Sequence, residues 1–114
     1  EYPLGILAYS ISLINGGDIA QAVKIASSSE TVLMDNRYVS ALYDKRAFRE
    51  LIPIMERRIK LDPSNIKNYT SLAALYLDPS VYDRAAARKV ILSTKDVDPT
   101  QVKTVEETLK KYGL

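Results

Sequence analysis

Apolar residues recur along the chain at the spacing of an amphipathic α-helix. Between residues 47 and 60 they fall at i, i+3, i+4, i+7 and i+11, which places them on one helical face. These positions are Phe48, Leu51, Ile52, Met55 and Ile59. Pro53 lies inside the run and predicts a mild kink, but the apolar stripe continues on both sides of it. The pattern therefore predicts a helix over 47–60 despite the proline.

Glycine and aspartate residues mark where the first and last helices end. The Asn-Gly-Gly run at 15–17 predicts the end of the first helix, because glycine adopts the left-handed conformation that closes helices. Asp18 is expected to cap the next helix, with Gln21 completing a capping box. Gly113 is expected to end the last helix.

Asp-Pro pairs are expected to start two further helices. Asp78 is predicted to cap one helix with Pro79 in its first turn, and Asp98 and Pro99 are predicted to start the last helix. The alanines at 85–87 are expected to allow close approach of a neighbouring helix. Together these signals predict seven helices joined by short connections, with neighbours antiparallel. The expected ranges are 3–14, 18–29, 31–44, 47–60, 65–77, 79–94 and 99–112.

The predicted helices are organised in tandem units. Asp62-Pro63 and Asp98-Pro99 lie 36 residues apart, and each follows a segment with the order helix, polar turn, helix. This periodicity predicts one all-α domain of about three helix-turn-helix repeats with a closing helix. The expected repeats span 3–31, 32–65 and 66–99, and the expected closing helix spans 99–112.

The composition excludes several kinds of chemistry. The chain has no Cys, which removes disulfides, thiolate metal sites and Cys nucleophiles, and no His, the commonest general base and metal ligand. The sequence contains no Gly-rich phosphate loop, hydrolase nucleophile motif or metal-binding motif. The paired carboxylates Glu106 and Glu107 are expected on an exposed helix face. We therefore expect no enzymatic activity, no cofactor and no metal site.

The net charge and the length of the apolar segments limit which classes of partner the chain is expected to bind. The net charge is +2, and acidic residues are interspersed among the basic clusters at 57–60 and 84–89, which disfavours a nucleic-acid partner. The most apolar segment, 4–14, is 11 residues long and too short to span a bilayer, so no direct membrane insertion is expected. The chain begins with Glu rather than Met, which suggests a piece of a longer polypeptide. The favoured compartment is the cytoplasm, with the soluble part of a membrane-anchored protein as the alternative.

The third unit resembles the tetratricopeptide repeat family. Counted from Ile66, it matches the residue types preferred at positions 4, 7, 8, 11 and 20 of a 34-residue unit. The matching residues are Tyr69, Leu72, Ala73, Tyr76 and Ala85. Lys89 and Val97 depart from the pattern, and the middle unit matches mainly at Pro63. The resemblance implies a right-handed α-α superhelix that acts as a non-catalytic interaction module.

The resemblance also implies where a protein or peptide would bind. Members of this family bind partners in a concave groove lined by the first helix of each repeat. The groove positions carried over from the second and third units are Asn36, Arg37, Ser40, Tyr43, Lys67, Thr70, Ser71 and Ala74. Arg37 and Lys67 either pair with a partner carboxylate or are solvated surface charges. The subfamily that clamps a C-terminal carboxylate is excluded, since only Lys67 matches its pattern.

The apolar N-terminal helix suggests a second interaction surface. Its apolar residues cover more than one face, so it would expose a patch unless upstream repeats, a second copy of the chain or another partner covers it. The residues expected to mediate self-association are Leu4, Leu7, Ile11 and Ile14. A monomer by light scattering, with this helix packed internally, would contradict self-association.

Two other roles remain open from the sequence. Degenerate repeats of this kind also end membrane glycan polymerases and ligases of the O-antigen kind, so the chain can be a soluble assembly or regulatory appendage of a larger enzyme. A nucleic-acid-binding role is the third alternative, and it would show a steep loss of binding with salt.

Overall fold

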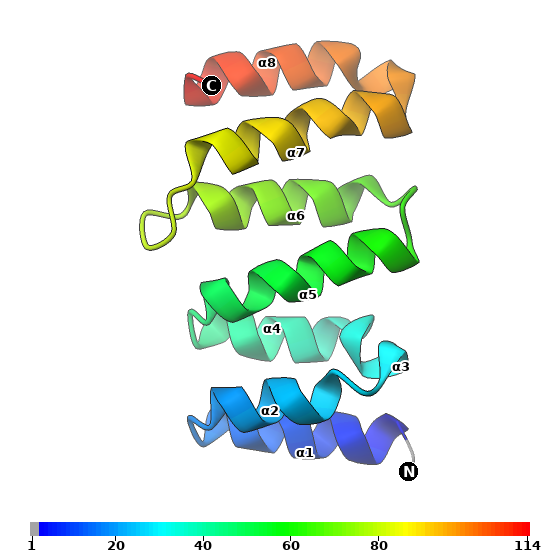
Figure 1. The fold of residues 1–114 in the computed structure, drawn as a ribbon, viewed down its shortest axis with the longest axis vertical. Coiled ribbons are helices and arrows are strands. Elements are labelled where there is room, and N and C mark those ends of the chain that lie inside the picture. The colour runs from blue at the N-terminus through cyan, green and yellow to red at the C-terminus, as the bar shows by residue number, and fades with distance from the viewer. Residues whose placement is uncertain (1–2) are drawn as a thin grey trace. The chain divides into compact units, whose positions relative to one another are not determined.

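A computed structural model describes residues 3–114 of the chain. Within these residues the chain forms eight α-helices and one 3₁₀ helix and no β-strand, which confirms the predicted all-α class (Figure 1). The elements are α1 (Pro3–Asn15), α2 (Ile19–Ala26), α3 (Glu30–Leu33), α4 (Asn36–Asp44), α5 (Phe48–Leu61), α6 (Ile66–Leu77), α7 (Arg84–Val97), the 3₁₀ helix η1 (Pro99–Gln101) and α8 (Val102–Tyr112).

The packing divides the chain into two units. The first unit covers Glu1–Ile54 and the second covers Met55–Leu114, so the boundary falls inside α5. Pro53 lies in this helix next to the boundary, and α5 continues through it as the apolar stripe predicts.

The first unit begins with an antiparallel hairpin of α1 and α2 (Figure 1). The turn is a Schellman motif, in which the Gly17 N–H donates to the Ile14 carbonyl at 3.0 Å and the Asp18 N–H to the Leu13 carbonyl at 2.8 Å. Gly17 has φ +90°, a conformation that a residue with a Cβ rarely adopts. Asp18 Oδ1 accepts a hydrogen bond from the Gln21 N–H at 3.3 Å, which confirms the predicted cap.

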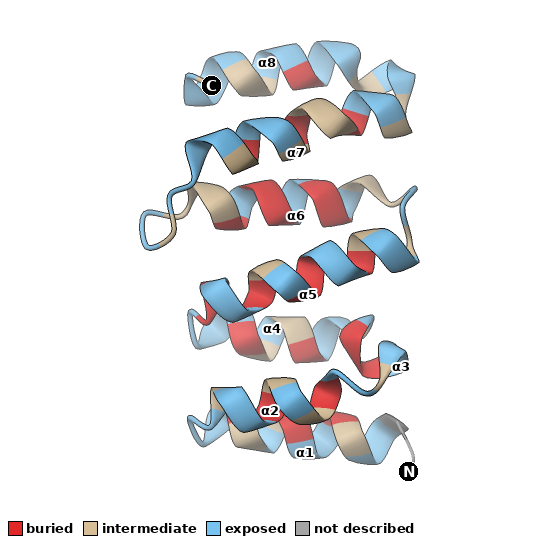
Figure 2. Cartoon of the chain, viewed as in Figure 1, coloured by how far each residue is buried: buried red, intermediate tan, exposed pale blue. Residues whose placement is uncertain are grey.

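Apolar side chains of α1, α2 and α4 form the core of the first unit. The helix α1 packs along α2 and also contacts α3 and α4. The buried residues of these helices lie on their inward faces (Figure 2), and they include the polar Ser10 as well as apolar residues. The buried side chains of α1, α2 and α4 include Leu7, Ile14, Ala22, Ala26, Tyr38 and Leu42. Small alanines on α2 allow its backbone to approach α1 closely.

The prediction of a single helix over 31–44 is wrong. The chain instead forms the short helix α3, breaks at Met34 and Asp35, and starts again as α4. Ser29 caps α3, with its hydroxyl accepting from the Val32 N–H at 3.3 Å, and Asp35 caps α4. The break follows from Asp35, because its carboxylate bonds the Arg37 N–H at 2.8 Å while its own backbone is extended. The predicted helix over 18–29 likewise stops early, at Ala26.

In the second unit, α6, α7 and α8 lie side by side with alternating directions (Figure 1). Their shared core is built on Ala73 of α6, Ile91 of α7 and Val105 of α8. Partly buried apolar side chains pack around it, namely Val90, Leu92, Leu109 and Leu114. The closing helix of the prediction is confirmed, except that its first turn is the 3₁₀ helix η1.

The predicted start of the α7 helix at Pro79 is wrong. Asp78 ends α6 in an extended conformation, and its Oδ1 accepts from the Ser80 N–H at 2.9 Å and the Ser80 hydroxyl at 2.7 Å. The helix begins at Arg84, because Asp83 is the residue whose carboxylate caps it, accepting from the Ala86 N–H at 3.0 Å. The alanines of this helix differ in burial. Ala87 is fully buried and Ala85, the residue matched to the repeat family, is exposed.

Substitution of the two alanines by leucine tests this register. Ala87→Leu is expected to lower the free energy of unfolding by about 1–3 kcal/mol, because the larger side chain has no room in the core. Ala85→Leu is the matched control, because it makes the same change on the exposed face of the helix. Leucine has nearly the helix propensity of alanine, so we expect little effect on the free energy of unfolding. Urea unfolding followed by circular dichroism measures both. A larger loss for Ala85→Leu than for Ala87→Leu would contradict the register.

The buried Tyr38 predicts a pH dependence of stability. Burial disfavours the phenolate and raises the pKa of Tyr38 to about 12, above its ordinary value near 10. Among the described residues its hydroxyl has no hydrogen-bond partner. The stability that the neutral phenol provides is complete below about pH 10 and is lost as the pH rises towards the folded pKa, since the unfolded chain ionises first.

Tyr38→Phe is therefore expected to keep the neutral-pH stability of the protein, or to raise it by up to about 1 kcal/mol, because an unpartnered hydroxyl is removed. Above pH 10 the variant should lose less stability than the wild type. Urea unfolding at pH 7 and pH 11 makes the comparison. A variant that is clearly less stable at pH 7 would show that the hydroxyl forms a stabilising hydrogen bond.

Candidate functional site

All eight residues predicted to line a groove lie on exposed faces. On α4 these residues alternate with the buried Tyr38 and Leu42, as the helical period requires (Figure 2). The exposed α4 residues are Asn36, Arg37, Ser40 and Tyr43, and the exposed α6 residues are Lys67, Thr70, Ser71 and Ala74. The two helices belong to different units, so a groove lined by both stays a prediction.

Arg37 already has a carboxylate partner in its own unit. Its Nε and Nη2 atoms bond Asp35 Oδ1 at 3.1 Å and Asp35 Oδ2 at 2.8 Å, a two-bond arrangement that suits a guanidinium. The hydrogen bond and the charge of Asp35 raise the pKa of Arg37 further above its ordinary value. A partner carboxylate would have to compete with Asp35, which makes Arg37 a weaker binding candidate than its exposure suggests.

The exposed α6 residues form a polar strip with one cation. Asn65 caps the helix by accepting from the Lys67 N–H at 3.1 Å, and the Thr70 hydroxyl donates to the Lys67 carbonyl at 3.1 Å. Within the described part of the chain, the Lys67 ammonium forms no ion pair. Lys67 is therefore more available to a partner carboxylate than Arg37.

The residues predicted for self-association separate into buried and exposed ones. Leu7 and Ile14 are buried in the first unit, because their face of α1 packs inward. Leu4 is 68% exposed and Ile11 is half-buried. The prediction that all four form one accessible patch needs correction, since only Leu4 and part of Ile11 can reach a partner.

A cluster of two aromatic rings and one cation stands at the end of α4. The Tyr43 and Phe48 rings meet edge to face, with centroids 5.3 Å apart and an interplanar angle of 61°. The Arg46 guanidinium carbon lies 4.9 Å from the centroid of the Phe48 ring. Phe48 is buried, whereas Tyr43 is 59% exposed. We call these three residues the Tyr43 cluster; it holds an exposed aromatic side chain in one orientation.

The backbone under the Tyr43 cluster is strained. Helix α4 ends in a Schellman motif, in which the Arg46 N–H donates to the Tyr43 carbonyl at 2.9 Å and the Ala47 N–H to the Leu42 carbonyl at 3.0 Å. This motif requires a left-handed residue, and Arg46 takes that place with φ +56°. Glycine is the usual residue there, because a Cβ costs about 1–2 kcal/mol in this conformation. Strain of this kind collects at functional sites.

Other predicted surfaces have mixed outcomes. Arg58 is buried, so the basic cluster at 57–60 is not a continuous surface, whereas Glu106 and Glu107 are exposed as expected. Within residues 3–114, no group of three or more acidic, His or Cys side chains is placed to hold a metal ion. None of the helices in that range has both the length and the apolar character needed to cross a bilayer.

Sequence reasoning named Tyr43 but missed Arg46 and the strained Tyr82. Tyr82 lies in the loop before α7 with φ +38°, and it was expected inside a helix that starts at Pro79. The available signal at Arg46 was the absence of glycine after α4, in the run Asp44-Lys45-Arg46-Ala47. A helix that ends in a Schellman motif without glycine needs another residue in the left-handed conformation.

Comparison of the chain with protein-family models, with curated proteins and with solved structures finds no match.

Two substitutions of Arg46 separate backbone strain from the ring contact. Arg46→Ala and Arg46→Gly both remove the cation above Phe48, but only glycine relieves the left-handed conformation. We expect the glycine variant to be more stable than the alanine variant by about 1 kcal/mol. Urea denaturation of the two proteins measures the difference. Equal stabilities would mean that the turn is not strained.

Proposed function

We propose that this chain is a non-catalytic protein–protein interaction module built from helical hairpins of the tetratricopeptide type. The observation that carries the proposal is Tyr43, a largely exposed aromatic residue packed against the Phe48 ring, which also contacts the Arg46 guanidinium. Tyrosine and arginine are enriched among the residues that dominate binding energy at protein interfaces. A tyrosine that is already oriented loses little conformational freedom when a partner covers it.

The rest of the α4 face is suited to surround such an anchor. Ser40 and Asn36 lie one and two turns before Tyr43 on the same exposed face, and both side chains are polar. Polar groups around a central aromatic residue are typical of a protein interface. A partner segment would place an apolar side chain against Tyr43 and run along the polar face of α4.

The strained conformation of Arg46 also supports the proposal. A sequence under pressure for stability alone would place glycine at position 46, and the turn keeps an arginine whose cation lies over the Phe48 ring. The retained arginine adds a charged, planar group next to the exposed tyrosine. This combination favours a binding surface over a purely structural turn.

The test combines site-specific crosslinking with a binding measurement. A photo-crosslinking phenylalanine analogue at position 43 identifies the partner in cells that express the chain, and titration calorimetry then measures the affinity of the purified partner. We expect Tyr43→Ala to weaken binding by at least about tenfold, as for a residue at the centre of an interface.

Tyr9→Ala is the matched control. Tyr9 has nearly the same exposure as Tyr43, 55% against 59%, but lies on α1 outside the Tyr43 cluster. It should leave the affinity unchanged. Loss of binding with Tyr9→Ala and not with Tyr43→Ala would move the interface to the exposed side of α1, and a partner that binds both variants normally would contradict the proposal for this surface.

A further inference from the structure

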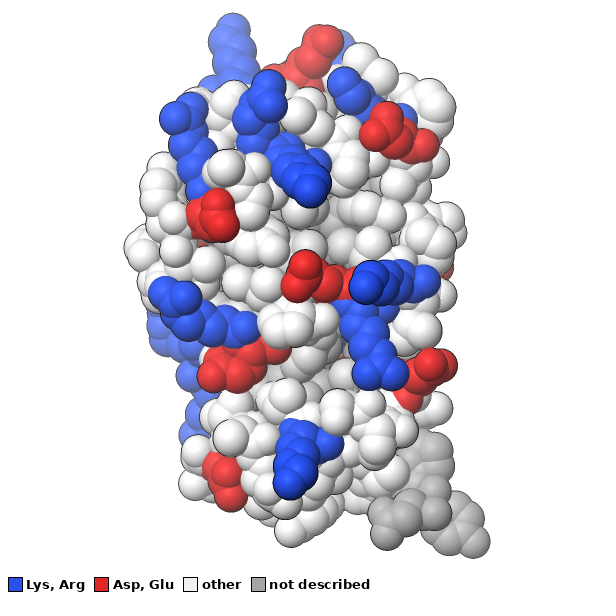
Figure 3. Space-filling view, viewed as in Figure 1, with Lys and Arg blue, Asp and Glu red and all other residues white. Residues whose placement is uncertain are grey.

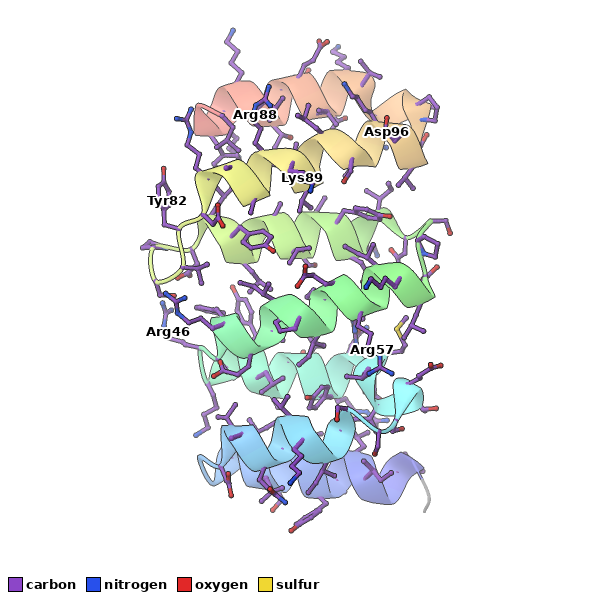
Figure 4. All side chains as sticks on the ribbon, viewed as in Figure 1. Arg46, Arg57, Tyr82, Arg88, Lys89 and Asp96 are labelled. Atoms are coloured by element: carbon purple, nitrogen blue, oxygen red, sulfur yellow. The ribbon has the colours of Figure 1, made fainter. Side chains whose placement is uncertain are left out.

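Basic side chains gather at one end of the α7–α8 hairpin in the second unit. Arg84 Nη2 donates a hydrogen bond to the Gly113 carbonyl, which joins the start of α7 to the end of α8. Figure 3 shows Lys and Arg side chains over this half of α7, and Figure 4 shows two of them, Arg88 and Lys89, on the helix. The exposed residues of this surface, here called the α7–α8 basic patch, are Arg84, Arg88, Lys89, Lys110 and Lys111.

The α7–α8 basic patch has an excess of positive charge, although Glu106 and Glu107 lie one turn before Lys110 and Lys111 on α8. The two segments that carry it, 82–89 and 108–114, contain one acidic residue, Asp83. Its Oδ1 accepts a hydrogen bond from the Ala86 N–H as the helix cap, so it is held at the helix end. Among residues 3–114, none of the five cations forms an ion pair. A surface with several unpaired cations of one sign attracts an anionic partner.

Two exposed tyrosines border the patch. Tyr82 is 60% exposed and takes a left-handed conformation immediately before Asp83, and Tyr112 is 52% exposed at the end of α8. The Lys111 ammonium lies 5.4 Å from the centroid of the Tyr112 ring. The Tyr112 ring offers an apolar surface next to a cation, so a ligand with alternating acidic and apolar or small side chains is complementary to it.

We infer that the α7–α8 basic patch docks an acidic segment of a partner protein. Arg84 and Arg88 are four residues apart on one helix face, which places their Cβ atoms about 5–6 Å apart. An extended peptide presents every second side chain on the same side, roughly 6.5 Å apart. Carboxylates at alternate positions of such a segment therefore match the two guanidinium groups, and the lysines of α8 extend the contact.

The neighbouring acidic residues favour a short polypeptide over a nucleic acid. Glu106 and Glu107 are exposed one turn before Lys110 and Lys111 on α8. A continuous phosphate backbone leaving the patch along α8 would approach these carboxylates, whereas an acidic peptide can confine its charges to the patch. The partner is thus expected to be a protein segment rich in Asp or Glu.

This inference extends the proposed interaction function to a second surface, and it shares no residue with the Tyr43 cluster. Failure of one surface can therefore be told from failure of the other. If Tyr43→Ala abolishes partner binding while the acidic probe described next does not bind, only the present inference is overturned.

The experiment uses the whole chain and a fluorescein-labelled peptide in which Glu alternates with Ser. Fluorescence anisotropy should show binding that weakens as salt is raised, and no binding of the same peptide with Gln in place of Glu. Arg88→Gln combined with Lys110→Gln should weaken the affinity about tenfold, since two exposed ion pairs are lost. Neither substitution touches the Arg84–Gly113 hydrogen bond.

The matched control is Lys95→Gln combined with Lys103→Gln. It removes the same charge from exposed positions of α7 and α8 at the other end of the hairpin, so it should leave peptide affinity nearly unchanged. An equal loss in both double variants would mean that only net charge matters and would overturn the inference. So would tighter binding of a single-stranded oligonucleotide than of the Glu-Ser peptide, or no peptide binding at low salt.

Discussion

The side-chain oxygens that cap the helices fix which residues of this chain face the core and which face a partner. Asp18, Ser29, Asp35, Asn65, Asp83 and Asp98 each accept a backbone N–H at the start of a helical element. A cap sets the first helical residue, and the helical period then assigns every later residue to a face. Because successive residues are about 100° apart at 3.6 residues per turn, the residues after each cap divide into a buried and an exposed face. The exposed α4 face and the α7–α8 basic patch therefore both depend on short polar contacts far from their centres.

The caps also account for what could and could not be predicted from the sequence. Asp18 and the stop at Gly113 were predictable because glycine stands beside each helix end. The choice between Asp78 and Asp83 was not, since both can cap and Pro79 suits a first helical turn. Asp78 instead bonds Ser80 in a local turn, a competition that apolar spacing does not register. Asp35 was missed for a related reason, because the four-residue α3 has too few apolar positions to show that the helix stops there.

The exposure of the side chains was easier to predict than their contacts with one another. The eight residues carried over from the repeat family all face solvent, because outward positions follow directly from the helical period. The intramolecular contacts of these surface residues could not be predicted from the helical period. The Asp35–Arg37 pair depends on the unexpected break before α4, and the contact of Arg46 with Phe48 depends on a left-handed residue that has no glycine. Contacts that arise at turns depend on local dihedral angles, which a periodic pattern does not encode.

The arginine at the end of α4 has a genetic consequence. Every arginine codon is a single base change from a glycine codon, so a relaxed turn is always one mutation away from the strained turn observed at Arg46. Such a mutation would gain fold stability and lose the cation over Phe48 in the same step. Selection for a more stable fold and selection for a charged surface therefore favour different residues at position 46. The residue found there in a given lineage indicates which of the two was stronger.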